Sequence, residues 1–220
     1  MKSKFPQRFL CVLLSLSLFL FLLTVSIGLP IYIRPFYYAH IDAMDLPEAS
    51  GFTREQIVEA YDEVLDYLTL PGREFGTGDL KYSESGKDHF ADCKVLFDLN
   101  AGVMLASGLL LAVLLVLRRR FGPYRLGKHS AAYYGALAAI VLPIVVGSLA
   151  ALDFDRAFVI FHSLFFPGKS NWLFDYRTDE IIRVLPQDFF MHCAMLIGGG
   201  LLVLSSSVII WDAVTSKKGK

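Results

Sequence analysis

The sequence is poor in the residues that build disulfide, zinc and serine-hydrolase sites. It has only three cysteines, and it contains no Cys-x-x-Cys, His-Glu-x-x-His or Gly-x-Ser-x-Gly motif. The commonest zinc sites and nucleophilic serine sites are therefore not indicated. Three cysteines cannot all pair, and we expect Cys11, Cys93 and Cys193 to be free thiols, buried or facing lipid.

The chain also lacks net charge, low-complexity tracts and internal repeats, whereas apolar residues are in excess. Hydrophobic residues make up 55% of the 220 residues, and the mean hydropathy is +0.50. A soluble core of this size cannot bury so much apolar surface, so lipid must solvate the rest. Crossing the hydrocarbon takes roughly 20 apolar residues. Four runs are long enough, at residues 9–33, 95–117, 131–152 and 189–211.

Charge is distributed unevenly between the connections. The N-terminus, the loop 118–128 and the C-terminal tail hold 11 bases and one acid, Asp212. The bases are Lys2, Lys4, Arg8, Arg118, Arg119, Arg120, Arg125, Lys128, Lys217, Lys218 and Lys220. Basic loops stay in the cytoplasm, so both termini are predicted there, and the segments 34–94 and 153–188 are predicted outside. The expected fold is an all-α integral membrane protein of one domain, with four transmembrane helices and a mainly helical extracellular cap.

The first run follows a basic start, as a signal peptide does. However, 25 apolar residues are too many for the core of a signal peptide, and no Ala-x-Ala-like cleavage site follows. We expect an uncleaved signal anchor.

Two helix starts are visible in the first external segment. Thr53 and Gln56 have the spacing of a capping box, and apolar residues then recur at helical period until Pro71-Gly72. Ser85 with Asp88 indicates a second start, from which a helix can continue into the second span. His89 would then stand roughly 9 Å outside Val95, at a rise of about 1.5 Å per residue. Asp92 lies three residues further on, close enough to hold the imidazole in one tautomer.

The second external segment is unusually aromatic. Its aromatic residues are typical of an interfacial belt, and a belt can coincide with an acyl-chain pocket. They include Phe161, Phe165, Phe166, Trp172, Phe174 and Tyr176. Near its end, Thr178-Asp179-Glu180 suits a helix start, and Ile181, Ile182 and Leu185 form one apolar side. This piece is predicted to lie flat in the membrane interface.

Five histidines are candidates for chemistry, and two differ from the rest. His89 and His162 both fall on external segments at the water-lipid boundary, among aromatic and acidic neighbours. His129 is expected to be solvated in the basic loop, and His40 and His192 are ambiguous. A metal site built from His89, Asp92, Cys93 and His162 is an alternative, but the spacing gives it little support. Ser163 lies next to His162 in the sequence, but this position alone does not indicate a serine nucleophile.

Two motifs resemble a known family, the bacterial lipoprotein intramolecular transacylases. The first is Asp88-His-Phe-Ala-Asp-Cys-Lys94. The second runs from Phe161-His-Ser-Leu-Phe-Phe166 through Trp172-Leu-Phe-Asp175, Thr178-Asp179 and Leu185-Pro186 to Phe189-Phe190. Cys93 stands where the family is expected to have valine, and Gly86 interrupts the approach to His89. The resemblance covers most of the chain and implies the four-helix, capped fold.

The resemblance also implies an enzyme of the bacterial plasma membrane. Its substrate would be a lipoprotein with a diacylglyceryl group on the sulfur of its N-terminal cysteine and a free α-amine. The sn-2 acyl chain would pass to that amine, giving an N-acyl, S-monoacylglyceryl lipoprotein. No cofactor, metal, nucleic acid or obligatory protein partner is implied, and membrane lipid is the only other partner.

On this view two histidines share the proton transfers that the reaction needs. His89, oriented by Asp92, is assigned as the base for the amine, and His162 as the donor to the ester oxygens, although the roles can be exchanged. Supporting roles in electrostatics or pocket shape are assigned to Lys94, Phe165, Phe166, Trp172 and Asp175. The alternative from another class is a non-catalytic membrane adaptor or sensor whose cap binds a partner.

Overall fold

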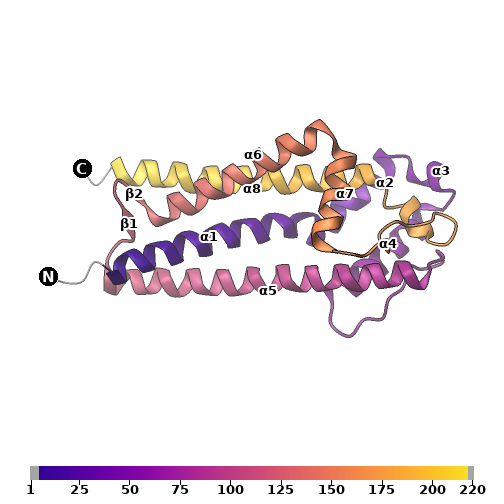
Figure 1. Cartoon of the computed structure of the whole chain (residues 1–220), viewed down its shortest axis with the longest axis horizontal. Coiled ribbons are helices and arrows are strands. Elements are labelled where there is room, and N and C mark those ends of the chain that lie inside the picture. Colours follow the sequence, from indigo (N-terminus) through magenta and orange to yellow (C-terminus); the bar gives the residue numbers. More distant parts are fainter. Residues whose placement is uncertain (1–4, 218–220) are drawn as a thin grey trace. The chain divides into compact units, whose positions relative to one another are not determined.

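The computed structural model describes residues 5–217 and is almost entirely helical. Lys2, Lys4, Lys218 and Lys220, used in the charge argument, lie outside the described residues. The helices are α1 (Phe5–Tyr32), α2 (Arg34–Ala43), α3 (Leu46–Ser50), α4 (Arg54–Thr69), α5 (Glu84–Phe121), α6 (Ala131–Leu152), α7 (Phe154–Phe165) and α8 (Gln187–Lys217), with the 3-10 helix η1 (Glu180–Arg183) (Figure 1). The two-residue strands β1 (Arg125–Leu126) and β2 (His129–Ser130) form a small antiparallel hairpin.

Four of the described helices are long and apolar enough to cross a membrane. They are the stretches Gln7–Tyr32, Glu84–Arg118, Ala131–Leu152 and Gln187–Thr215. Large apolar side chains on them stay exposed, among them Leu105, Leu109 and Val203. Surface of this kind is stable only against lipid. The prediction of an all-α protein with four membrane-spanning helices is confirmed.

The chain divides into two compact units. One comprises the residues up to Leu29, Asn100–Leu149 and those from Met195, and we call it the bundle unit. The other comprises Pro30–Leu99 and Ala150–Ala194, and we call it the cap unit. Each of the four long helices contributes residues to both units.

Small residues allow the helices of the bundle unit to pack closely. A Cβ atom on Gly135 of α6 would come within 2.4 Å of the Ser15 carbonyl oxygen on α1. The Ser15 hydroxyl donates to the Ala131 carbonyl at 2.7 Å, which joins the same two helices. A Cβ on Gly200 of α8 would lie 2.5 Å from the Leu29 side chain. Glycine at position 200 therefore allows α1 and α8 to approach closely.

The cap unit has its own hydrophobic core, centred on α4. Thr53 and Gln56 form the predicted capping box at the start of this helix. Its apolar face is buried at the predicted positions: Ile57, Ala60, Tyr61, Val64 and Leu68. The core also holds Tyr37, whose ring stacks on Tyr61 at 3.8 Å and whose hydroxyl donates to the Val184 carbonyl.

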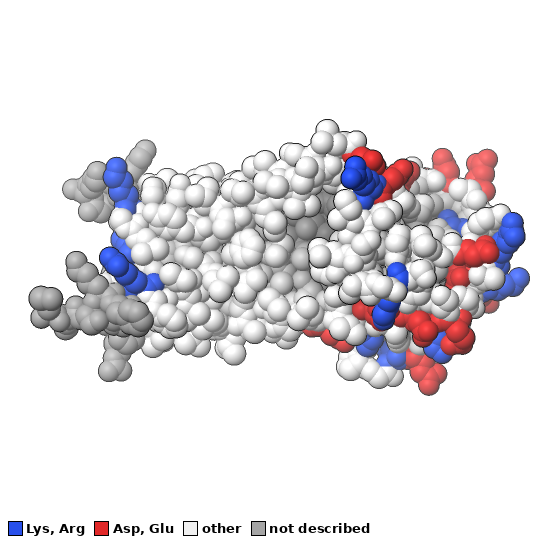
Figure 2. Space-filling view, in the orientation of Figure 1, with Lys and Arg blue, Asp and Glu red and all other residues white. Residues whose placement is uncertain are grey.

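The acidic face of α4 is only partly a plain solvated surface. The Asp62 and Asp66 carboxylates both pair with Arg34, and Asp62 also accepts a hydrogen bond from the Tyr38 hydroxyl. These contacts join α2 to α4. The other charges of the cap are spread over its exposed surface, whereas the sides of the bundle unit show almost none in the same view (Figure 2).

The prediction that residues 178–185 lie flat in the membrane interface is wrong. The segment forms only one 3-10 turn, η1, and Ile181 is almost fully buried in the cap core together with Val184 and Leu185. The apolar residues that suggested an interfacial helix are instead core residues. Their spacing alone cannot distinguish a lipid-facing side from a protein-facing side.

Candidate active site

His89 is held on α5 just after the start of that helix. The helix begins at Glu84, slightly before the predicted position, and the Ser83 hydroxyl accepts a hydrogen bond from the Gly86 amide. The His89 side chain is 5% exposed and lies among the rings of Phe166 and Phe174, at 4.9 and 5.4 Å. Its Nδ1 is buried and has no hydrogen-bond partner among the described residues. An imidazole nitrogen in such a position is available to a ligand.

His162 lies on α7. The sequence did not predict this helix, because the segment that contains it stood out only by its aromatic residues. Asp153 caps the start of α7 by accepting from the Arg156 amide. His162 lies in the last turn and is 7% exposed, with Trp172 stacked on it at 4.5 Å. Its Nδ1 is 2.8 Å from the Phe158 carbonyl oxygen. Because a carbonyl can only accept, Nδ1 must carry the hydrogen, and Nε2 keeps its lone pair in the neutral ring.

The two imidazoles lie against each other within the cap unit. Their ring centroids are 5.8 Å apart, and the ring planes are 33° from parallel. Two positive charges at this separation, with so little water, would repel strongly. The pair is therefore suited to hold one proton at most and to pass protons through a bound substrate. Such a pair can supply a base and a hydrogen-bond donor at the same time.

The protonation of His162 follows from its surroundings. Burial lowers the pKa of His162 below its ordinary value, and the hydrogen bond to the Phe158 carbonyl opposes this effect in part. The neutral ring therefore persists to lower pH than in an exposed histidine. At neutral pH the Nε2 lone pair is free to accept a proton.

This pKa shift gives the first prediction. The imidazole C–H resonances of His162, followed by NMR in micelles, should titrate with a midpoint below the ordinary histidine value of about 6.5. The spectrum of a His162→Ala variant identifies the resonances. A midpoint at or above 6.5 would contradict the lowered pKa. A midpoint above neutrality would mean that the ring is largely charged at neutral pH, and it would contradict a role as a ready base.

Asp92 does not orient His89 as predicted. Its carboxylate accepts hydrogen bonds from Lys169 and from the Asn171 amide, and no hydrogen bond joins it to the imidazole. The spacing of three residues placed Asp92 on the correct side of α5, but the loop after α7 supplies stronger partners. Instead, the Cys93 sulfur lies 3.4 Å from Nε2 of His89.

Lys94 and Asp175 are also placed differently from the prediction. The Lys94 ammonium donates to the carbonyls of Tyr67 and Leu70, where it ties the end of α4 to α5. Asp175 is exposed and accepts from the Arg177 amide within its own turn. Neither contact involves an imidazole, and a supporting role of either residue at the site stays a prediction.

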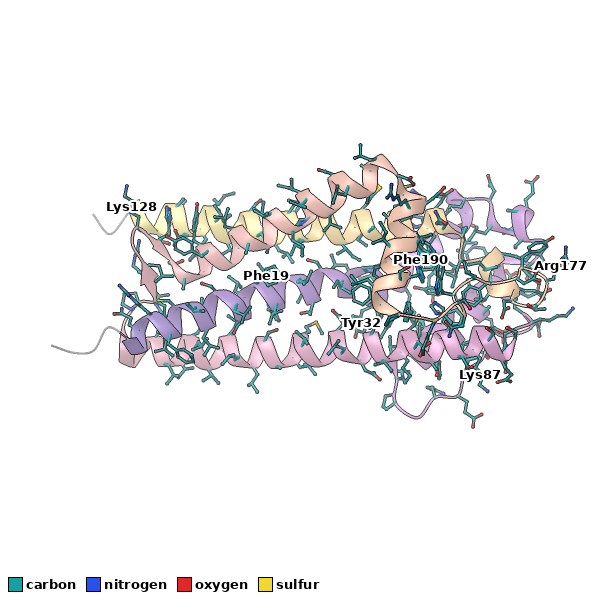
Figure 3. All side chains as sticks on the ribbon, in the orientation of Figure 1. Phe19, Tyr32, Lys87, Lys128, Arg177 and Phe190 are labelled. Carbon is teal, nitrogen blue, oxygen red and sulfur yellow. The ribbon has the colours of Figure 1, made fainter. Side chains whose placement is uncertain are left out.

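The predicted aromatic residues divide into two groups. Phe166 is buried against His89, and Trp172 covers His162. Phe165 is exposed and contacts Phe161 rather than either histidine. Phe158 and Phe174, which had no assigned role, also lie beside the imidazoles. The position of Phe158, four residues before His162, could have indicated that it lies beside the imidazole. Phe190, labelled in Figure 3, packs against Phe158.

The other histidines lie elsewhere. His40 and His192 form a separate ring contact at 5.0 Å in the cap unit. His129 is not simply solvated, since its Nδ1 is 2.9 Å from the buried carboxylate of Asp212 in the bundle unit. No group of three or more His, Cys, Asp or Glu side chains that could hold a metal ion occurs within residues 5–217.

Gly86 has a structural explanation. A Cβ atom at this position would lie 2.1 Å from Oδ1 of Asp179, a buried carboxylate that accepts from the amide and hydroxyl of Ser83. The glycine therefore lets the segment before η1 approach the start of α5, one turn before His89. What looked like a degraded motif is a requirement of this packing.

We predict that Gly86→Ala destabilises the protein. Helix propensity favours alanine by about 1 kcal/mol, but overpacking of this kind costs about 1–3 kcal/mol and displaces Asp179. The apparent melting temperature in detergent should fall. Gly102→Ala on the same helix is the control, because a Cβ there meets nothing within 4 Å. If Gly86→Ala melts at or above the unmodified protein, the close packing is not required.

Comparisons with known proteins agree with this architecture. The family model of the lipoprotein intramolecular transacylase Lit matches residues 12–190. The solved structure of the membrane-integral Lit from Bacillus cereus superposes with a TM-score of 0.88 at 26% identity, covering 99% of this chain and all of the other. No curated protein sequence matches.

Two further solved structures are variants of the same Bacillus cereus protein. One carries a histidine-to-arginine substitution (TM-score 0.80, 24% identity, covering 98% of this chain and 96% of the other). The second carries a histidine-to-alanine substitution (TM-score 0.80, 25% identity, covering 98% and 97%). The family match extends over both imidazoles and most of the chain, and the whole fold superposes. This membrane protein therefore belongs to the lipoprotein intramolecular transacylase family, whose members are membrane acyltransferases.

Proposed function

We propose that this protein moves the sn-2 acyl chain of an S-diacylglyceryl cysteine to the α-amine of the same residue, using His89 and His162 as the catalytic groups. The observation that carries the proposal is the buried imidazole pair, 5.8 Å apart, in a chain of this family. The product is an N-acyl, S-monoacylglyceryl lipoprotein. The substrate supplies both the acyl group and the nucleophile, so the reaction needs no external donor or cofactor.

The tautomer of His162 favours an exchange of the roles first assigned from the sequence. Nε2 of His162 keeps its lone pair because Nδ1 is bound to the Phe158 carbonyl. We assign this nitrogen as the base that takes a proton from the attacking amine. Nδ1 of His89, which is buried and has no partner within residues 5–217, is then the hydrogen-bond donor to the ester oxygens. The Cys93 thiol, within contact of Nε2, suits that tautomer.

The chemical steps balance with these two groups. The amine nitrogen attacks the sn-2 carbonyl carbon and gives up a proton to His162. The carbonyl oxygen gains negative charge, which a donor from His89 stabilises. The bond between the carbonyl carbon and the glyceryl oxygen then breaks, and that oxygen receives from the His162 imidazolium the proton that came from the amine. An amide and a free sn-2 hydroxyl result, and the enzyme returns to its starting protonation.

The shape of the site supports an intramolecular reaction. Phe166, Phe174 and Trp172 surround the two imidazoles with apolar surface, which suits an acyl ester and excludes water. Holding an amine and an ester together contributes roughly 7–11 kcal/mol to lowering a barrier. Membrane lipid and the lipoprotein are the partners we propose, with no nucleic acid and no obligatory protein partner.

Mass spectrometry tests the reaction. The gene would be expressed in a bacterium that lacks N-acylating enzymes, and the N-terminal lipopeptide of a reporter lipoprotein would be analysed. An N-acyl, S-monoacylglyceryl cysteine is expected. An unchanged diacylglyceryl lipopeptide, with the protein present in the membrane, would instead favour the adaptor or sensor hypothesis.

We also propose that the protein lies in the bacterial plasma membrane with both termini in the cytoplasm and the cap unit outside. The support is the basic connection between α5 and α6, whose Arg118, Arg125 and Lys128 are exposed, against the acidic surface of the cap. In this orientation the imidazole pair meets lipoproteins on the outer face.

Cysteine labelling in intact cells checks this orientation. A membrane-impermeant reagent should label Ala49→Cys in the cap and not Lys128→Cys in the hairpin, in a background without native cysteines. Both positions are exposed, whereas Ser50, next to Ala49, is buried and therefore unsuitable for labelling. Labelling both in permeabilised cells is the control. The reverse pattern in intact cells would show that the topology is opposite to the one proposed.

A further inference from the structure

An open pocket of about 450 Å³ lies on the cap unit, between the two segments that carry His89 and Trp172. It is lined by Ser85, Asp88 and Asp92 from α5 and by Lys169–Asn171 from the loop after α7. The same two segments carry the catalytic candidates, since His89 and Cys93 adjoin its α5 wall in sequence and Trp172 follows Asn171 directly. The Trp172 indole donates to the Lys169 carbonyl, which holds the loop in shape while the ring covers His162.

The polar groups of the pocket differ in whether they already have partners. Lys169 and the Asn171 amide nitrogen are both bound to the Asp92 carboxylate. The Asn171 Oδ1 is therefore fixed as an acceptor, and it is buried without a hydrogen-bond partner in the part of the chain that the structure describes. Asp88 is exposed in the pocket wall, and neither a hydrogen bond nor an ion pair joins its carboxylate to another described residue. The pocket thus offers spare acceptors, while the charge of its ammonium, Lys169, is offset by Asp92.

Spare acceptors beside an acyl-transfer site fit a ligand that presents N–H groups. The substrate of the proposed function has such a segment, since the peptide chain leaves the acylated cysteine and exposes backbone amides. Of the three charged residues, Lys169 neutralises Asp92, and Asp88 remains as an uncompensated negative charge. A cationic side chain near Asp88 would be favoured, and an anionic one repelled.

We propose that this pocket binds the peptide segment immediately after the acylated cysteine, with Asn171 accepting a backbone N–H and Asp88 selecting against acidic residues there. This inference rests on the proposed function and adds a specificity determinant to it. The enzyme then reads the peptide part of the lipoprotein as well as its lipid part.

Three synthetic lipopeptides test the proposal, each with an S-diacylglyceryl cysteine followed by Lys, Ser or Asp. The purified full-length protein should convert the Lys peptide with a kcat/KM on the order of 2–5 times that of the Asp peptide, the range for an exposed charge pair. Asp88→Asn should bring the ratio close to one. Glu48→Gln on α3 makes the same change of charge on exposed surface outside the pocket and should keep the preference.

The outcomes separate this inference from the proposed function. Conversion of none of the peptides by the unmodified protein would refute the reaction itself. Equal conversion of all three, or a preference that survives Asp88→Asn, would refute the peptide site alone. If Asp88→Asn does not insert, added salt decides the question, because screening should remove the preference of the unmodified protein. A preference that is unchanged at high salt would overturn the proposal.

Discussion

Alanine in place of His89 or His162 is expected to reduce turnover of a diacylated lipopeptide by a factor on the order of 10² to 10⁴, the usual contribution of a general acid-base group. Each change removes one of two functions that the reaction needs at once, a base for the amine or a donor to the ester. The rate is measured by mass spectrometry of the lipopeptide product with purified protein in detergent.

The control for these variants is His40→Ala. His40 also lies in the cap unit, and its Nδ1 contacts the carbonyl four residues earlier, Phe36, at 2.7 Å, as Nδ1 of His162 contacts the Phe158 carbonyl. It differs in lying against His192 instead of the proposed catalytic pair, His89 and His162. His40→Ala should therefore keep most of the activity. Full activity in either His89→Ala or His162→Ala would remove that residue from the mechanism.

The relative effects of the two variants bear on the assignment of roles. With a substrate analogue whose amine is less basic, the requirement for a base is weaker, so the defect of the base variant should shrink. We expect this for His162→Ala, since Nε2 of that ring holds the free lone pair. The same recovery in His89→Ala instead would restore the assignment first made from the sequence.

The parts of this structure that depend on local sequence were predictable. The four spans follow from run length and composition, and α4 follows from its capping box and its apolar period. His89 and His162 could be selected because both fall on predicted external segments at the water-lipid boundary, among aromatic and acidic neighbours. Their proximity could not be derived from spacing, because 73 positions separate them in the sequence and only the tertiary fold brings them to 5.8 Å.

The failed predictions share a physical cause, which is competition between partners that are distant in sequence. Asp92 was near enough to hold His89, but Lys169 and Asn171 from another segment occupy its carboxylate. Ile181 and Leu185 had the pattern of an interfacial helix, but the cap core buries them. Gly86 looked like a departure from the family motif, but a Cβ atom at this position would clash with Asp179. Local patterns identify what a residue can do, and tertiary neighbours decide which of these options is used.

The acyl group is expected never to leave its own substrate molecule. The proposed amine attack is direct, because the amine and the sn-2 ester belong to one residue and need only be folded together. Proximity of this kind makes a covalent enzyme intermediate unnecessary. One substrate with heavy acyl chains and another with a heavy peptide and light chains would be mixed, and the products would be weighed. No exchange of labels between peptides should occur.

Cys93 is the group that could change this result. Its sulfur lies 3.4 Å from Nε2 of His89, and an imidazole at such a distance can activate a thiol as a nucleophile. However, Cys93 packs against the hydrophobic core of the cap, and apolar surroundings disfavour the thiolate that such a step requires. Cys93→Val should therefore remain active, because valine keeps the apolar contact and direct attack needs no sulfur.

Scrambled labels would show that the acyl group is released or transferred between molecules. An inactive but correctly inserted Cys93→Val would point to a thioester step, and the mechanism with two histidines and no covalent intermediate would have to be abandoned even if the overall reaction stood.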